Sequence, residues 1–230
     1  MTACLTIAGY DPTGKAGVLA DFETFKALSM EPTAVITAVT AQNNKRVRAI
    51  HPLTPSLITE QFNSLKKTAA IKIGMLANAA IVRQVAKLLP GNVPVVLDPV
   101  LRASTGRALL EPKAIPTLKE SLFPLCTVIT PNRSEAEKLL GRKIHDLERA
   151  AEDLLALGPE AVVITGGAQA DVLADSRGVK IVEGKRVRGT ARGTGCRHSS
   201  ALAAYLARGK TIRQAASQAR QYVRRYVAST

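Results

Sequence analysis

Residues 4–42, with the sequence CLTIAGYDPTGKAGVLADFETFKALSMEPTAVITAVTAQ, decide the fold class of this chain. Residues 4–8 form a short apolar run typical of a buried strand, and residues 33–42 form a second one. Between them, apolar side chains recur at helical spacing over 18–28, after a glycine-containing turn. The order strand, helix, strand predicts two parallel strands in one sheet, covered by a helix.

The same alternation continues to residue 230. We expect further strands at 47–52 (an edge strand), 71–76, 93–97, 127–130 and 161–165, and hairpins over 171–188. We expect helices at 55–67, 79–89, 133–140, 146–157, 194–207 and 211–229, the last with Thr211 and Gln214 as a capping box. Since there is no linker, repeat or low-complexity tract, the sequence predicts one α/β domain over 1–230, with a mostly parallel sheet and helices on both faces.

The composition narrows the class of protein. Of the 230 residues 46% are hydrophobic, enough for a full core, and the formal net charge of +14 suits an anionic partner. The basic residues are spread along the chain without aromatic–basic motifs, so we expect phosphorylated small molecules and not nucleic acid. Three cysteines without a CxxC pair, no secretory leader and no apolar run of about 20 residues predict a soluble, cytoplasmic protein without a membrane partner.

The segment 193–196, GTGC, is the first candidate site. Ligands of parallel sheets bind beyond the carboxyl ends of the strands, and this segment opens a predicted helix there. Glycine N–H groups at a helix N-terminus can bind an anion. We expect the pKa of the Cys196 thiol to be lowered there, near Arg192 and Arg197, so that it accepts a proton from a substrate hydroxyl. The alternative is a tight turn before a core helix, with an inert cysteine.

Other polar residues follow strands as well. Asn132 and Glu135 could hold Mg²⁺ beside a nucleotide, or form only an N-terminal capping box. Asp98 ends a strand, where it could serve a metal or start an Asp-Pro turn. The Gln42 amide suits the edge of an aminopyrimidine and Met75 could lie against its ring, although the residues by themselves favour an exposed loop glutamine and a core methionine.

Together these segments resemble the hydroxymethylpyrimidine/phosphomethylpyrimidine kinases of thiamine biosynthesis, in the ribokinase-like superfamily. The resemblance covers nearly the whole chain. Its stretches are 5–9 with Asp11 and 14–21, 36–38 with 41–43, 72–76, 96–100, 130–132 with Glu135, and 193–196. The resemblance implies a ribokinase-like three-layer sandwich that uses ATP and Mg²⁺ to phosphorylate 4-amino-5-hydroxymethyl-2-methylpyrimidine and especially its monophosphate. It also implies a homodimer.

The resemblance further implies roles for individual residues. Substrate binding would fall to Gln42, Ala16, Asp21 and Met75. Catalysis would fall to Cys196 as the base, where the wider superfamily usually has Asp, and to Gly193, Thr194 and Gly195 as the anion hole. ATP binding would fall to Asn132, Thr165, Gly167 and Arg197, and metal binding to Glu135 and Asp98.

Some positions depart from the family. Thr165 stands where its members usually carry a lysine that touches ATP phosphates. We expect Lys15, Arg192 and Arg197 to face one another across the site and to favour a substrate that already carries a phosphate. A pyridoxal/pyridoxine kinase of the same fold and a non-catalytic pyrimidine-binding sensor are the alternative functions.

Overall fold

The computed structural model describes residues 2–166, 170–183 and 191–230. Its strands are β1 (Ala3–Tyr10), β2 (Glu31–Gln42), β3 (Val47–Pro52), β4 (Ala70–Ile73), β5 (Val95–Leu97), β6 (Val128–Ile129), β7 (Ala161–Ile164), β8 (Ala170–Asp175) and β9 (Gly178–Glu183). Its α-helices are α1 (Gly17–Ala27), α2 (Pro55–Asn63), α3 (Ala79–Leu88), α4 (Ile115–Ser121), α5 (Arg133–Leu140), α6 (Leu147–Leu155), α7 (Thr194–Ala207) and α8 (Ile212–Ala228).

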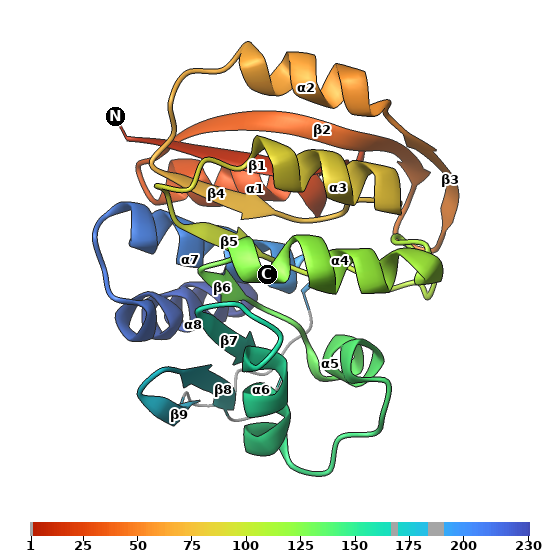
Figure 1. The fold of residues 1–230 in the computed structure, drawn as a ribbon. Coiled ribbons are helices and arrows are strands. Elements are labelled where there is room, and N and C mark those ends of the chain that lie inside the picture. The colour runs from red at the N-terminus through yellow and green to blue at the C-terminus, as the bar shows by residue number, and fades with distance from the viewer. Residues whose placement is uncertain (1, 167–169, 184–190) are drawn as a thin grey trace.

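One nine-stranded sheet runs through the molecule in the order β3-β2-β1-β4-β5-β6-β7-β8-β9 (Figure 1). The six strands from β2 to β7 in this order are parallel, whereas β3 at one edge and the hairpin β8–β9 at the other are antiparallel. The predicted mostly parallel sheet and the predicted edge strand are therefore confirmed. The carboxyl ends of the parallel strands meet at one side of the sheet, where a ligand site is expected.

Helices cover both faces of this sheet, so the predicted three layers are confirmed (Figure 1). Side chains alternate along β1: Leu5 and Ile7 join a core with helices α2 to α6, while Cys4 joins a core with α1, α7 and α8. Small residues of α7, such as Ala201 and Ala204, are fully buried and let this helix lie close against the sheet.

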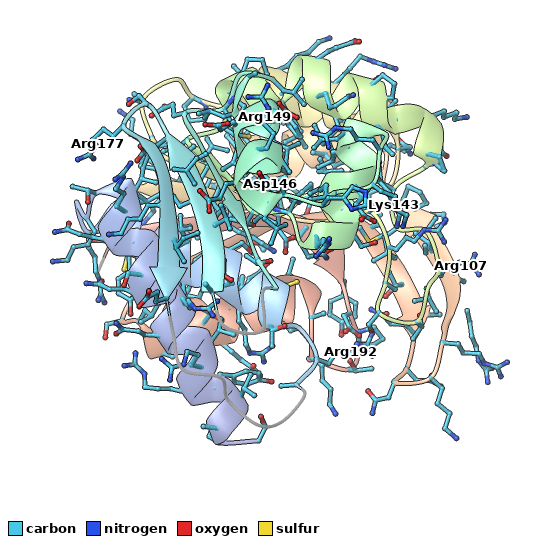
Figure 2. All side chains as sticks on the ribbon, turned by 90° about the horizontal axis from the view of Figure 1, so that it is seen from below. Arg107, Lys143, Asp146, Arg149, Arg177 and Arg192 are labelled. Atoms are coloured by element: carbon cyan, nitrogen blue, oxygen red, sulfur yellow. The ribbon has the colours of Figure 1, made fainter. Side chains whose placement is uncertain are left out.

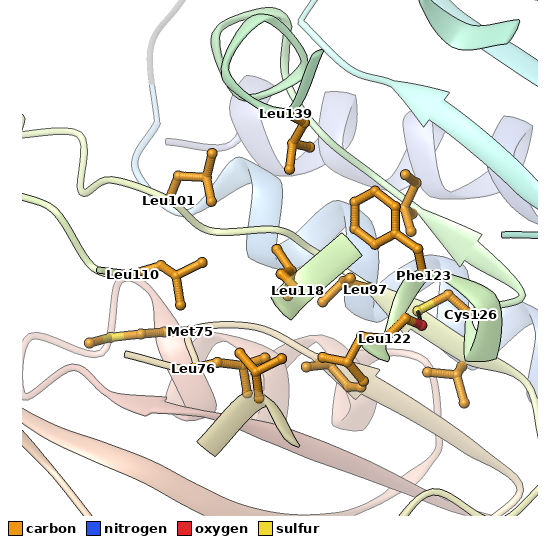
Figure 3. Packing of buried hydrophobic residues seen from close by; sticks show 14 of the residues in the cluster. Met75, Leu76, Leu97, Leu101, Leu110, Leu118, Leu122, Phe123, Cys126 and Leu139 are labelled. Atoms are coloured by element: carbon orange, nitrogen blue, oxygen red, sulfur yellow. Dashed lines mark hydrogen bonds between the residues drawn. The ribbon is translucent and has the colours of Figure 1, made fainter. Parts of the chain in front are cut away.

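The segment between β5 and β6 was not predicted to contain structure. It forms α4, whose Leu118 packs with Leu97 and with Leu122 and Phe123 in the first core (Figure 3). The sequence of this seven-residue helix has no clear helical spacing of apolar residues, which is why it was not predicted. Packing against the rest of the core stabilises it. The strand predicted over 71–76 ends at Ile73, after which the chain turns toward the pocket described below.

Local signals at the end of the chain agree with the structure. Arg177 N donates to Asp175 Oδ1 (2.8 Å) in the tight turn between β8 and β9, and Gly178 there has φ +89°. Thr211 and Gln214 form the predicted capping box of α8. Residues 184–188 of the predicted hairpins lie outside the described residues. Within the described ranges, no helix has the length and apolar character that crossing a bilayer requires.

Candidate active site

A pocket of about 310 Å³ lies at the carboxyl ends of the parallel strands. Its wall combines the ends of β1, β2, β4, β5, β6 and β7 with the N-terminus of α7. The predicted site residues in this wall are Ala16, Gln42, Met75, Asp98, Asn132, Glu135, Thr165, Gly193, Thr194, Gly195 and Cys196. The topology of the sheet thus brings together residues that are up to 180 positions apart in the sequence (196 minus 16).

The predicted anion hole rests on a close approach of two backbone segments. Gly193 has φ +76°, and a Cβ there would lie 1.9 Å from the carbonyl oxygen of Lys15. Gly17 has φ +60°, and a Cβ there would lie 2.3 Å from the carbonyl oxygen of Gly9. Only glycine fits both positions, so the loop after β1 packs directly against the start of α7. Residues 193–196 at this helix start line the pocket, and the first N–H groups of a helix are the ones that can bind an anion.

The expectation of a lowered pKa at Cys196 is wrong. Burial raises the pKa of the Cys196 thiol to about 12, and the charges of Asp98 and Asp21 raise it further. Lys72 and the N–H of Gly17 act in the opposite direction without prevailing. The helix N-terminus is present as predicted, but enclosure by protein outweighs it. Cys196 is therefore a neutral thiol in the free protein.

Asp98 and Glu135 form a carboxylate pair in the pocket wall. Burial raises the pKa of Asp98 to about 6, against the opposing charge of Lys72. Burial, together with the charge of Asp98, raises the pKa of Glu135 to about 8. Two buried carboxylates that disfavour each other's charge suit a divalent cation, and Mg²⁺ takes one or two carboxylates plus phosphate oxygens and water. The donor set thus fits Mg²⁺, although the described residues contain no group of three or more His, Cys, Asp or Glu placed to hold a metal by themselves.

Glu135 also has the capping role. Its Oε2 accepts from the Asn132 N–H (2.9 Å), and Asn132 Oδ1 accepts from the Glu135 N–H (3.0 Å). The two interpretations are compatible, because the capping box holds the carboxylate at the pocket wall. Asn132 pairs in turn with Thr165 across a β-bridge, which places Thr165 at the same end of the pocket.

Gln42 ends β2 at another part of the wall. The pairing of β2 with β3 shifts register between Ala41 and Gln42, an irregularity of the kind that re-aims side chains near active sites. Met75 lies against Gly9, where a Cβ would come within 2.8 Å of its sulfur. Ala16 borders the same space. Small residues beside a flexible thioether leave room for a flat ring.

Asp21 does not lie at the pocket wall. Its carboxylate is fully buried and accepts from Lys72 Nζ (2.8 and 3.0 Å), Thr6 (2.6 Å) and Ser200 (2.8 Å). The expected direct contact with substrate is therefore corrected to a structural ion pair beneath the site. Lys72 itself borders the pocket and was not predicted. The sequence did contain a signal, because Lys72 stands between two isoleucines in a strand expected to be buried. A buried lysine is almost always paired with an acidic group, so a partner could have been expected.

Arg197 also turns away from the pocket. Its guanidinium donates to the Lys15 carbonyl (2.9 Å) and to Glu23 (2.6 Å) and lies 4.1 Å from the centre of the Tyr226 ring. Neither Arg197 nor Lys15 lines the pocket, so the expected ring of three cations reduces to Arg192. Arg197 joins α7 to α1 and α8 and supports the anion hole from behind. Gly167, the remaining predicted ATP contact, lies outside the described residues.

A helix start and two carboxylates around one pocket of a parallel α/β sandwich are groups that phosphoryl transfer can use, because they suit phosphate oxygens and a divalent cation. Residues 11–230 match the family model described as phosphomethylpyrimidine kinase. A hydroxymethylpyrimidine/phosphomethylpyrimidine kinase of Bacillus subtilis is 39% identical over 98% of this chain and 89% of its own. This chain belongs to the phosphomethylpyrimidine kinase family, and it is a phosphotransferase.

Solved structures agree on the fold. A phosphomethylpyrimidine kinase from Clostridium difficile has a TM-score of 0.85 and 35% identity, covering 99% of this chain and 100% of its own. A pyridoxal kinase from Staphylococcus aureus, solved in complex with pyridoxal, reaches a TM-score of 0.90 at 28% identity, covering 99% of this chain and 88% of its own. The backbone is thus shared by kinases that are named for two different substrates, so the fold alone does not determine the substrate.

Proposed function

We propose that the protein transfers the γ-phosphoryl group of ATP to 4-amino-5-hydroxymethyl-2-methylpyrimidine and, with preference, to its monophosphate. The observation that carries this proposal is that Gln42 and the start of α7 lie in the wall of one pocket. Its relatives named for both pyrimidine substrates support the choice of ring. Arg192, the one predicted cation retained in this wall, adds positive charge to the pocket, and this charge favours a substrate that already carries a phosphate without contacting it directly.

The chain's own groups supply positioning, charge stabilisation and a proton acceptor. The N–H groups of 193–195 stabilise the phosphoryl oxygens as negative charge develops on them. The Cys196 thiolate takes the proton of the attacking hydroxyl and becomes the thiol. This thiolate forms from the resting thiol by loss of a proton to solvent, and the positive charge of Lys72 and the Gly17 N–H favour it. Because the transition state is loose, the hydroxyl proton leaves late, when the oxygen is already strongly acidic.

The nucleotide end of the pocket is assigned to Asn132, Thr165 and the carboxylate pair. Glu135 and Asp98 would hold Mg²⁺ directly or through water. When bound, Mg²⁺ would offset the charge of the ATP phosphates. The homodimer implied by family resemblance stays a prediction, which sedimentation equilibrium would check.

Glu135→Gln should raise the Mg²⁺ concentration needed for half-maximal activity about 10-fold, because a ligand charge is lost while glutamine keeps the capping geometry. The measurement is a Mg²⁺ titration at saturating ATP. An unchanged melting temperature, expected from the retained cap, is the control. A Mg²⁺ curve identical to the wild type would leave Glu135 with the capping role alone.

The competing function is phosphorylation of pyridoxal. It is considered because a pyridoxal kinase from S. aureus shares this fold with a TM-score of 0.90. Comparing kcat/KM for the aminopyrimidine, its monophosphate and pyridoxal separates the two. We expect the monophosphate to be used best and pyridoxal at least about 10-fold less well than either pyrimidine. A higher value for pyridoxal would replace the proposal, and binding of pyrimidine without turnover would indicate a sensor.

A further inference from the structure

Arg192 connects two segments of the pocket rim that are 150 residues apart. It precedes the anion-hole glycine and reaches across to the turn between β2 and β3. Its Nη2 donates to Gln42 Oε1 (2.9 Å), and its Nη1 donates to the carbonyl of Asn43 (3.1 Å). Figure 2 shows Arg192 beside this hairpin. The side chain is 17% exposed, so protein surrounds most of the contact.

The contact fixes which end of the Gln42 amide meets a ligand. A guanidinium has only donors, so the amide atom that faces Arg192 must be the oxygen. The amide nitrogen is then the end left to donate, and Gln42 lines the pocket. A glutamine free to rotate could offer either end to a ligand. Held by Arg192, it offers a donor, which requires an acceptor such as an unprotonated ring nitrogen.

Asp11 supplies the opposite polarity beside it. Asp11 is 2% exposed and lines the same pocket, and its Oδ1 accepts from the N–H and hydroxyl of Thr13 (2.9 and 2.8 Å). Among the described residues, Oδ2 has no hydrogen-bond partner. The nearest cationic atom is Arg192 Nη2, at 3.8 Å. A buried carboxylate oxygen without a donor is costly, so it favours a ligand that brings one.

We propose that Arg192 is a specificity-determining residue that sets the polarity of one recognition edge. The Gln42 nitrogen donates to a ring nitrogen, and Asp11 Oδ2 accepts from an exocyclic amino group beside that nitrogen. A 4-aminopyrimidine carries this acceptor–donor pair, whereas pyridoxal has no amino group on its ring. This inference rests on the proposed function and adds to it the residues that select the aminopyrimidine within a shared fold.

A double-mutant cycle tests whether Arg192 acts through Gln42. We expect Arg192→Ala to raise KM for the unphosphorylated aminopyrimidine about 10-fold with little change in kcat, the scale of one charge-assisted hydrogen bond. In a Gln42→Ala background the same change should raise KM less than about 2-fold. Equal effects in both backgrounds would overturn the proposal. So would a loss confined to the monophosphate, because Arg192 would then bind the phosphate directly.

Arg107→Ala is the matched control. Arg107 also clamps the β2–β3 hairpin, donating to the carbonyls of Val47 and Arg48 (3.3 and 3.2 Å), but it does not line the pocket. Both arginines are labelled in Figure 2. We expect Arg107→Ala to leave KM within about 2-fold of the wild type. An equal rise in the two variants would show a general effect of loosening the hairpin and would contradict the specific role of Arg192.

Substrate analogues test Asp11. Removing the 4-amino group from the pyrimidine should raise KM about 10-fold with the wild type, but less than about 2-fold with Asp11→Asn, which keeps the size of the side chain. An equal penalty in the two proteins would overturn the role of Asp11. Melting temperatures show whether each variant is folded. If the wild type does not phosphorylate the aminopyrimidine at all, the proposed function fails; if it does and the cycles are additive, only this inference fails.

Discussion

Lys72→Met should destabilise the protein by about 3–5 kcal/mol, the cost of leaving one member of a buried ion pair without its partner. Lys72 and Asp21 are both completely buried and 2.8 Å apart. Burial alone would lower the pKa of Lys72, but the Asp21 carboxylate raises it above its ordinary value. The lysine is thus charged in the folded protein, and its removal leaves an uncompensated carboxylate under the active site. Urea unfolding at pH 7 measures the loss.

The double variant Lys72→Met with Asp21→Asn is the control for this interpretation. Thr6 and Ser200 donate to different oxygens of Asp21, so asparagine keeps one of these acceptors and turns its NH2 donor toward the other hydroxyl, and neither member of the pair is charged. We therefore expect it to recover most of the stability lost in the single variant. If the single variant loses less than about 1 kcal/mol, or the double variant recovers nothing, the pair does not stabilise the fold in this way.

Cys196→Ala should lower kcat on the order of 100-fold, the effect of removing a positioned proton acceptor. The melting temperature and the KM for ATP should stay near the wild-type values, because the proposed anion hole consists of backbone groups of 193–195, which the substitution keeps. Steady-state kinetics with Mg-ATP and the pyrimidine monophosphate measure the change. A kcat within about 3-fold of the wild type would make Cys196 a packing residue and leave catalysis to the anion hole.

Cys196→Asp sharpens the same test. Aspartate is the base that resemblance to the wider superfamily implies at this position, so this variant should be more active than Cys196→Ala. Burial raises the pKa of the thiol to about 12, so deprotonation increases with pH and kcat of the wild type should rise toward alkaline pH. A carboxylate ionises at lower pH, and the rise in Cys196→Asp should move in that direction. Identical pH profiles would contradict a proton-accepting role.

The sequence predicted the elements whose signals are local. Asn132 and Glu135 have the spacing of a capping box and form one, and the apolar runs became the parallel strands. The order of glycines and polar residues after those strands was enough to place most of the pocket wall. The rule that ligands bind beyond the carboxyl ends of parallel strands turned sequence order into proximity.

What failed depends on contacts between distant segments. Arg197 is turned away from the site by its contacts with Glu23 and Tyr226. Both partners are distant in the sequence, so the residues next to Arg197 do not predict these contacts. Likewise the helix start that should lower the pKa of Cys196 is visible in the sequence, but the burial that raises it is not. Asp21 was assigned to substrate by resemblance, and its true partner, Lys72, lies 51 residues further along the chain, where the local sequence does not reveal the pairing.

Formation of the pyrimidine diphosphate tests the central claim most directly. The purified protein is incubated with Mg-ATP and 4-amino-5-hydroxymethyl-2-methylpyrimidine monophosphate, and the products are followed by ³¹P NMR and mass spectrometry. We expect ADP and the diphosphate in equal amounts, with Cys196→Ala markedly slower. Folded protein that forms no diphosphate above the enzyme-free control would contradict the account.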